Sequence, residues 1–348
     1  MSVYDLSLEQ LGERFRSWGE PAFRARQVYA QLWRRAARYE EMSDVPARVR
    51  ERCETDLPLD VTVLAERTAD RGATRKALLE LGSDRHVIEA VLMGYPGRVT
   101  VCVSTQVGCA MGCGFCATGQ MGLLGNLSAG EIAAQVIWAK REVARLPPST
   151  PRRLTNVVFM GMGEPLANER GTFGAMERLT DPAALGLGAR HLTVSTVGLI
   201  PGIRHLASAH PQVGLAVSLH AASDELRSQL VPPNDLYPLE ALESAMADWR
   251  GTTRRRPSIE WAMIDHVNDT EEQAALLAPI ARRLGAHVNL IPLNPTPGYP
   301  VVGSSKTRIR RFVDVLERAR VNVTVRDTRG RRIDAACGQL RLELTPTP

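Results

Sequence analysis

The chain has 348 residues, and its 44% hydrophobic and 23% charged residues are typical of a soluble globular protein with a sizeable core. No stretch approaches the roughly 18 consecutive apolar residues of a membrane span, and the first residues lack the basic region and apolar run of a secretory leader. These features argue against a membrane or secreted protein. We therefore expect a cytoplasmic protein whose six cysteines are reduced, which favours ligand or redox roles over a structural disulfide framework.

Positive charge is spread unevenly along the chain, which carries 43 basic and 38 acidic residues for a net charge of +5. Arginines are concentrated in residues 14–52, 152–153, 254–256 and 308–332. Arginine binds a phosphate through two donors, and each phosphate contact releases counterions, so these patches favour a nucleic acid partner. The alternative is a codon bias toward arginine, because lysine is rare in this chain.

The first 56 residues have the pattern of three short helices. Ser7-Leu-Glu-Gln10 is a capping box, which predicts a helix from there to about Trp18. Pro21 is a favoured first-turn residue and predicts the start of a second helix, and a third follows Pro46. We expect residues 1–56 to form an arginine-rich helical accessory domain.

Residues 57–97 change to the pattern of strands. Apolar segments at 61–64, 76–81 and 86–93 are separated by Asp-Arg-Gly and Gly-Ser-Asp, which are turn sequences. This pattern predicts a short antiparallel β extension.

From residue 98 to 348 short apolar strands alternate with helices, as in a parallel sheet with right-handed crossovers. The predicted strands are residues 99–103, 156–160, 191–195, 214–218, 259–263, 287–293 and 322–326. The predicted helices are residues 128–144, 171–179, 200–207, 239–249, 270–284 and 306–320. Six units are fewer than a closed eightfold barrel requires, so we expect an α/β fold with a partial (β/α)6 barrel whose ligand site lies at the carboxyl ends of the strands.

Three cysteines, Cys109, Cys113 and Cys116, lie within eight residues directly after the first barrel strand. Thiolates this close can bind one soft metal centre, and the glycines between them let the backbone wrap around it. A structural zinc site normally has four ligands, often as two separated pairs, and no second pair is found in the sequence. An iron–sulfur cubane held by three thiolates would leave one iron open to a small molecule. Zinc, the cubane and a chance cluster all remain open at this point.

Other polar residues follow the later strands, at the same edge of the predicted sheet. They are Gly163 and Glu164, Ser195, Ser218, Leu219 and His220, and Asn294. Taken singly, each has a simpler explanation as a turn, a helix cap or a satisfied core histidine. Together they surround one opening, which favours a small polar ligand beside the three cysteines.

The spacing Cys109-x-x-x-Cys113-x-x-Cys116 is the signature of radical S-adenosylmethionine (SAM) enzymes. Further blocks make the chain similar to the RlmN/Cfr family within that group, and the resemblance runs from about residue 89 to residue 340. These blocks are Cys102-Val-Ser-Thr-Gln-Val-Gly-Cys109, Met160-Gly-Met-Gly-Glu-Pro-Leu-Ala-Asn168, Val217-Ser-Leu-His220, Asn289-Leu-Ile-Pro-Leu-Asn-Pro-Thr-Pro297 and Ala335-Ala-Cys337-Gly-Gln-Leu340.

The resemblance implies two cofactors, a [4Fe-4S] cluster and SAM. The cluster would be held by the three cysteines of the motif, and its open iron would bind the amino and carboxylate groups of SAM. Transfer of an electron would then release a 5′-deoxyadenosyl radical. The residues implied to hold SAM are Gly163, Glu164, Ser195, Ser218, Leu219, His220 and Asn294.

The resemblance also implies that a distant cysteine carries the methyl group. Cys337 matches the family cysteine that accepts a methyl group from one SAM and, after hydrogen abstraction by the radical from a second SAM, adds its methylene radical to an adenine carbon. Cys102 matches the thiol that forms a disulfide with it to release the product, and Glu89 matches the general base.

The function implied is methylation of carbon-2 of an adenine in 23S rRNA, with tRNA as a further substrate. The N-terminal helices would bind RNA, the enzyme would be a monomer, and a flavodoxin or ferredoxin would supply electrons. One rival is carbon-8 methylation of the same adenine, as in the Cfr branch. Another, from a different class, is a zinc-stabilised RNA-binding protein without catalysis.

Two positions depart from the family pattern. Gly125 stands where an arginine is expected before Asn126-Leu127, so a cation is missing there. Pro233 stands where an aliphatic residue is usual.

Overall fold

The computed structural model describes most of the chain. The described residues are 2–59, 61–82, 84–294, 296, 299, 302–326, 333 and 338–340.

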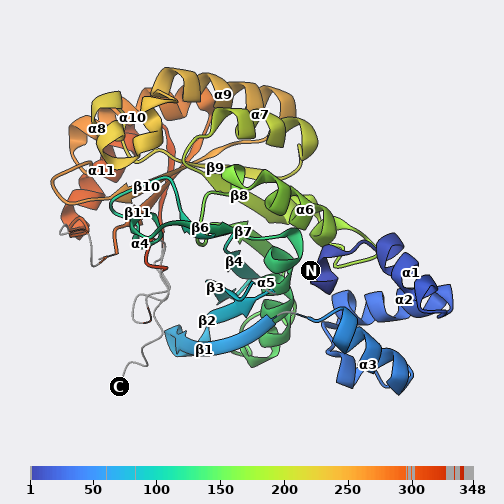
Figure 1. Ribbon diagram of the computed structural model, residues 1–348. Coiled ribbons are helices and arrows are strands. Elements are labelled where there is room, and N and C mark those ends of the chain that lie inside the picture. Colours follow the sequence, from blue (N-terminus) through green and yellow to red (C-terminus); the bar gives the residue numbers. More distant parts are fainter. Residues whose placement is uncertain are drawn as a thin grey trace.

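Three helices form the N-terminal unit, which lies to one side of the central sheet (Figure 1). They are α1 (Leu8–Ser17), α2 (Ala22–Ala30), which continues as a π-helical turn (Gln31–Arg35), and α3 (Ala47–Asp56). The predicted capping box is present, because the Ser7 hydroxyl accepts from the Gln10 N–H and the Gln10 side chain accepts from the Ser7 N–H. The three predicted N-terminal helices are thus confirmed.

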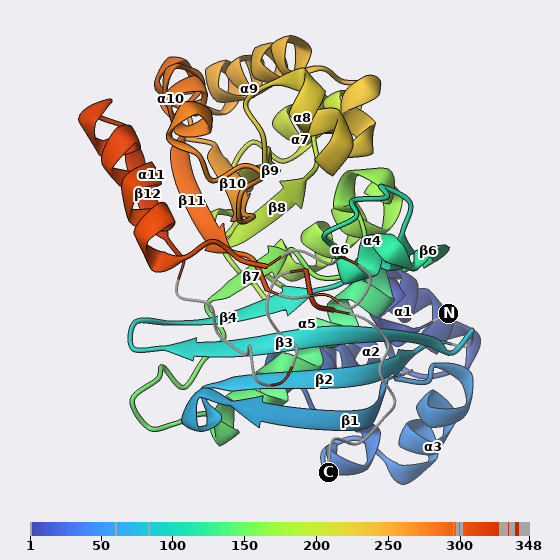
Figure 2. The ribbon, with the colours of Figure 1, turned by 90° about the vertical axis from the view of Figure 1, so that its left-hand side faces the viewer.

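A mixed sheet forms the centre of the molecule, and ten of its strands lie in the described residues. In spatial order they are β1 (Val61–Ala69), β2 (Thr74–Leu81), β3 (His86–Tyr95), β4 (Arg98–Val103), β7 (Asn156–Phe159), β8 (Leu192–Thr196), β9 (Gly214–Ser218), β10 (Ser258–Met263), β11 (His287–Pro292) and β12 (Asn322–Val325). Strands β1 to β4 are antiparallel, and every pairing from β4 to β12 is parallel. Figure 2 shows the antiparallel strands continuing into the parallel ones.

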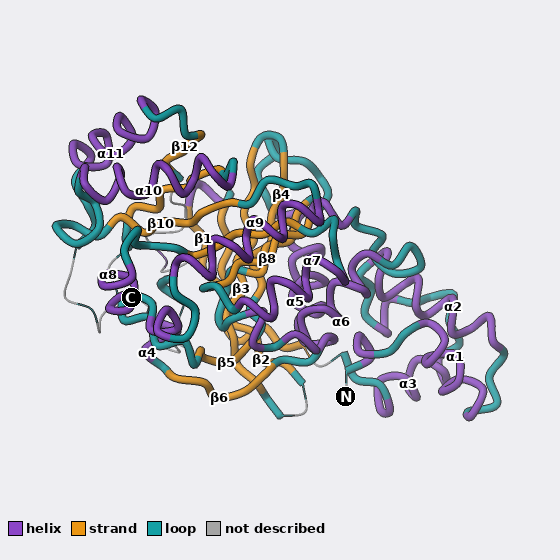
Figure 3. Tube along the Cα trace, turned by 90° about the horizontal axis from the view of Figure 1, so that it is seen from above, coloured by secondary structure: helices purple, strands orange, loops and turns teal. Residues whose placement is uncertain are grey.

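Helices connect the parallel strands and cover the outer face of the sheet (Figures 1 and 3). They are α5 (Ala129–Glu142), α6 (Glu169–Thr180), α7 (Ile200–Ala209), α8 (Asp224–Leu230), α9 (Leu239–Thr253), α10 (Glu271–Leu284) and α11 (Lys306–Arg318). Six β/α units therefore lead from β4 to β12 in the described part of the chain, and the predicted fold class is confirmed. The predicted extension, residues 57–97, is hydrogen-bonded to β4 as part of the same sheet, while the three domain boundaries stay a prediction.

The strand register separates the side chains of the sheet into two faces. Side chains alternate along a strand, and directly paired residues point to the same side. The outer face carries apolar side chains such as Val101, Val194 and Trp261, none of which is exposed to solvent. This face packs against the connecting helices and forms the core.

The inner face carries the polar side chains. Cys102 on β4 pairs with Val91 on β3, so their side chains point to the same face. Glu89, two residues before Val91 on β3, points to that face as well. On the parallel strands Ser218 pairs with Glu260, which pairs in turn with Asn289, and these residues share the same inner face. The register therefore brings three of the predicted site residues, Cys102, Glu89 and Ser218, to one side of the sheet.

Candidate active site

The three cysteines lie on a hairpin that the sequence predicted only as a loop. It consists of β5 (Gln106–Cys109), the cysteine loop, a short helix α4 (Ala117–Gln120) and β6 (Gly122–Asn126). Strands β5 and β6 pair with each other as a separate two-stranded sheet. Gly108 allows this close pairing, since its φ is +72° and a Cβ there would lie 1.9 Å from the Gly122 carbonyl oxygen.

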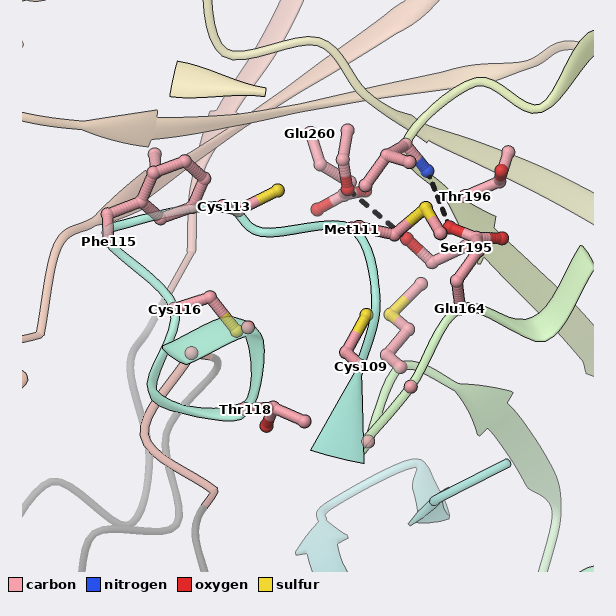
Figure 4. A pocket seen from close by; sticks show the side chains of 18 of the residues that line it. Cys109, Met111, Cys113, Phe115, Cys116, Thr118, Glu164, Ser195, Thr196 and Glu260 are labelled. Carbon is pink, nitrogen blue, oxygen red and sulfur yellow. Dashed lines mark hydrogen bonds between the residues drawn. The ribbon is translucent and has the colours of Figure 1, made fainter. Parts of the chain in front are cut away.

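The side chains of Cys109, Cys113 and Cys116 line one cavity and surround a common space (Figure 4). Burial raises the pKa of the Cys109 thiol to about 12, and burial also raises the pKa of the Cys113 thiol. Ionised thiols in this position therefore need a compensating positive charge, which a metal centre supplies. Within the described residues, no group of three His, Cys, Asp or Glu side chains is placed to hold a single metal ion.

Glu164 lines the same cavity from the segment after β7. Its carboxylate accepts hydrogen bonds from the N–H groups of Leu166 (3.0 Å) and Val197 (2.8 Å), which join the ends of two neighbouring strands. Burial raises the pKa of Glu164 to about 7, and the two N–H donors oppose the rise. The preceding Gly163 has φ +97°, and a Cβ on it would lie 2.5 Å from the Gln106 Cβ. Only glycine therefore allows β5 to approach this segment.

His220 lines the cavity at the end of β9, in a left-handed backbone conformation with φ +61°. Its Nδ1 accepts from the Ala262 N–H at 2.9 Å, so the proton of the neutral ring is on Nε2. Burial lowers the pKa of His220 to about 3, and the Arg227 charge lowers it further. Asn268, fully buried, holds this turn by donating to the His220 carbonyl oxygen at 2.7 Å. His220 is therefore a neutral, fixed group at physiological pH.

A row of polar side chains crosses the inner face beside the cavity. Ser195 on β8, labelled in Figure 4, and Ser218 on β9 line it, and their hydroxyl oxygens are 3.5 Å apart. Glu260 on β10 also lines it and accepts from the Asn289 amide at 2.8 Å. Sequence reasoning missed Glu260, although one acid at an inward position of an otherwise apolar strand could have identified it.

Two of the residues predicted to hold SAM lie beside the cavity without lining it. Leu219 is buried, and its N–H donates to the Glu260 carbonyl oxygen at 3.1 Å, which links β9 to β10. Asn294 is buried just beyond β11. The cavity lining thus includes five of the seven predicted residues, namely Gly163, Glu164, Ser195, Ser218 and His220.

Of the three residues predicted to transfer the methyl group, two lie in the described part of the chain. Cys102 and Glu89 are both buried on the inner face, and Glu89 forms an ion pair with Lys76 at 2.7 Å. Cys337 lies outside the described residues. Its neighbour Gly338 lines the cavity and accepts from the Ala117 N–H at 2.8 Å.

The end of this tail segment is also held beside the cysteine loop. The Thr118 hydroxyl donates to the Leu340 carbonyl oxygen at 2.7 Å. Residues 338–340 are therefore fixed to α4, the helix that follows Cys116.

Gly125, the position where an arginine is expected, lies on β6 against His86. A Cβ at Gly125 would be 3.1 Å from His86 Nε2, and His86 Nδ1 lies 3.0 Å from Glu131 Oε1. The ring of His86, on β3, therefore lies next to the position where the side chain of the expected arginine would begin.

Comparison with known proteins agrees with this geometry. The model of the Radical SAM superfamily matches residues 103–251, and the model of the ribosomal RNA large subunit methyltransferase N-terminal domain matches residues 1–57. The chain is 49% identical to a protein of Chloroflexus aurantiacus, with 97% of this chain and 92% of that protein covered. It is 53% identical to a protein of Salinispora arenicola, with 92% and 86% covered. Both relatives are named probable dual-specificity RNA methyltransferase RlmN.

A solved structure shows the same fold. The crystal structure of a radical SAM methyltransferase from Sphaerobacter thermophilus is similar with a TM-score of 0.93 at 48% identity, covering 98% of this chain and 99% of that one. A partial barrel with this cysteine loop defines the radical SAM class of enzymes. Within that class, the chain belongs to the RlmN family of methyltransferases. None of the helices in the described residues could cross a membrane.

The geometry of the β5–β6 hairpin predicts different effects for alanine substitutions at two of its glycines. Gly108 and Gly122 both have positive φ, but a Cβ at Gly122 meets no atom within 4 Å. We expect Gly122→Ala to cost only the left-handed strain of about 1–2 kcal/mol. Gly108→Ala adds a clash with backbone, so it should open the hairpin, seen as faster hydrogen exchange of β5 and β6. Equal exchange in the two variants would contradict the close pairing of these strands.

Proposed function

We propose that this chain is a radical SAM methyltransferase that adds a methyl group to carbon-2 of an adenine in 23S rRNA, and also in tRNA, through an S-methylated Cys337. The observation that carries the proposal is the meeting of two sequence features at one cavity: the three cysteines and the polar ends of β7, β8 and β9. The names of the relatives, which refer to dual-specificity RNA methyltransferases, support RNA as the substrate.

The cysteine side chains fit a [4Fe-4S] cluster. Each of the three thiolates would bind one iron of the cluster around the same space. The fourth iron would then keep an open coordination position for SAM. Together the bound cluster and SAM supply a carbon radical that can abstract hydrogen from a methyl group. The protein itself has to bind, orient and shield these groups.

The cavity residues are suited to hold SAM. Glu164 presents a carboxylate for the positively charged amino group, and its orientation is fixed by the N–H groups of Leu166 and Val197. Ser195 and Ser218 offer hydroxyl groups, and the neutral His220 ring offers an N–H. Apolar side chains, Phe115 among them, complete the lining and exclude water.

Cys337, Cys102 and Glu89 would then carry out the transfer. The Cys337 thiolate would accept the methyl group of one SAM, which leaves as S-adenosylhomocysteine. The radical from a second SAM would take a hydrogen atom from this methyl group, and the methylene carbon would then bond to carbon-2 of the adenine. Glu89 would accept the carbon-2 proton as the general base, while the adduct returns one electron to the oxidised cluster. The Cys102 thiolate would attack the Cys337 sulfur, which forms a disulfide and breaks the bond from sulfur to the methylene carbon, and that carbon takes up a proton to become the methyl group of the released base. Support comes from the shared inner face of Glu89 and Cys102, and from the attachment of Gly338, next to Cys337, to the cysteine hairpin.

The N-terminal helices would bind the RNA. Their arginines include several that are exposed to solvent, among them Arg14, Arg26, Arg34 and Arg48. Exposed arginines bind phosphates without reading sequence, so this surface would position the RNA. The target base would have to leave its stack to reach the cavity.

Cys113→Ala tests the cluster. We expect the wild-type chain, purified without oxygen, to be brown with about four irons per chain, and the variant to lose the cluster because one of three ligands is gone. Cys53→Ala is the matched control, since Cys53 is also buried but lies on α3, away from the cavity. Stoichiometric zinc in place of iron in the wild-type protein would instead establish the zinc-stabilised alternative.

Glu164→Gln tests the SAM site. Loss of the carboxylate removes the charge partner of the SAM amino group, and an amide cannot accept from both N–H groups. Hydrogen bonds to charged groups contribute about 1.5–3 kcal/mol, so SAM should bind roughly ten- to a hundredfold more weakly to the cluster-loaded variant in calorimetry. Glu169→Gln, a nearby exchange at a half-buried carboxylate paired with His205, is the control. Unchanged SAM affinity in Glu164→Gln would exclude this role.

A further inference from the structure

Arg227 is a buried arginine on α8 that no sequence motif identified, and it has no solvent exposure. Its guanidinium group binds the chain at the carboxyl ends of β8 and β9. Nε donates to the Leu219 carbonyl oxygen (3.1 Å), and Nη2 donates to the carbonyl oxygens of Val197 (2.5 Å) and Ser218 (3.4 Å). Nη1 donates to Asn234 Oδ1 at 2.8 Å. Arg227 therefore fixes the segments that carry the proposed SAM-binding residues.

The charge of Arg227 has no carboxylate partner among the described residues, because all four acceptors are neutral oxygens. The charge of Asp224, on the same helix, raises the pKa of Arg227, but the Asp224 carboxylate accepts its hydrogen bonds from the Asn234 amide and the Leu239 N–H. Burial lowers the pKa of Arg227 to about 10, which still leaves it charged at neutral pH. A buried cation that no carboxylate binds directly is costly unless further negative charge lies nearby.

The cysteine loop packs against the chain that follows Arg227, and the two residues whose carbonyl oxygens bind Nη2 of Arg227, Val197 and Ser218, line the same cavity as Cys113. Cys113 packs with Leu230 and Val231, which follow Arg227 along the chain, in one buried cluster. A Cβ on Gly112 would lie 3.8 Å from Pro232 Cγ. The charge of Arg227 also acts on Cys113, where it opposes the rise in thiol pKa caused by burial.

A cluster bound by three thiolates carries net negative charge, and reduction adds to it. In a medium of low dielectric constant a nearby cation stabilises the more negative state, and net charge is among the factors that set the reduction potential of iron–sulfur clusters. We propose that Arg227 is a positioning residue with two effects: its charge makes the cluster easier to reduce, and its fork of N–H groups holds the ends of β8 and β9 for SAM. This inference rests on the proposed function, since it requires a cluster at Cys113.

Two variants separate the charge from the hydrogen bonds. Arg227→Gln removes the charge, whereas Arg227→Lys keeps the charge and loses the planar fork. Arg250→Gln, an exposed arginine on α9, is the control. The reduction potential of the reconstituted cluster is measured by a redox titration followed by electron paramagnetic resonance, in the full chain without RNA. SAM affinity is measured by calorimetry on the same preparations.

We expect a more negative potential in Arg227→Gln, a potential near that of the wild type in Arg227→Lys, and no change in Arg250→Gln. SAM should bind about tenfold more weakly in both Arg227 variants, because each loses at least one hydrogen bond to a carbonyl oxygen. An unchanged potential in Arg227→Gln with full iron content would overturn the proposal, and so would equal shifts in both variants or loss of iron from both. A wild-type chain that takes up no cluster would instead overturn the proposed function.

Discussion

The alternation of side chains across the parallel strands is the constraint on which the rest of the structure depends. Each strand from β4 to β12 has an outer face that must pack against helices, as Val194 and Trp261 do, and an inner face that is free to carry polar groups. A one-residue shift in the register of β9 would place Ser218 in the apolar core, and the same shift in β10 would place Glu260 there. Each polar group left unpaired in the core would cost several kcal/mol. The apolar core and the position of the site are therefore set by the same register.

The polar groups that result are buried, so each of them must be satisfied by the protein. Glu164 is held by two N–H groups, His220 by one N–H, and Asn268 supports the turn of His220. The donors to Glu164 and His220 are backbone N–H groups, and Asn268 donates from its side chain. These hydrogen bonds fix the orientation of the polar groups, as is expected where a reactive group must be placed accurately.

The fold was predictable because long regular elements leave clear patterns in the sequence. The strands and helices predicted from residue 98 onward are all present in the structure, and so is the capping box at Ser7. The β5–β6 hairpin was missed because its two short strands lie among glycines and cysteines, whose pattern indicates a loop. Helix α8 was missed because a segment of only seven residues gives little periodicity.

The site was predictable where its residues sit in motifs, and not elsewhere. The cysteines, Glu164 and His220 follow strands, so their convergence could be inferred from the parallel sheet. Glu260 and Arg227 were not found, because a single charged residue within a strand or helix does not reveal which groups lie around it until the chain is folded. The roles of Cys102 and Glu89 came from family resemblance alone, and the register adds that both lie on the inner face.

The central claim is that the cavity and the inner face together methylate carbon-2 of an adenine by way of a protein cysteine. Nucleoside mass spectrometry of 23S rRNA tests it most directly, after incubation of unmodified RNA with the reconstituted chain, SAM and a reductant. The account predicts 2-methyladenosine with the wild-type chain and none with Cys337→Ala. Formation of 8-methyladenosine, or of any methylated adenosine by Cys337→Ala, would contradict it.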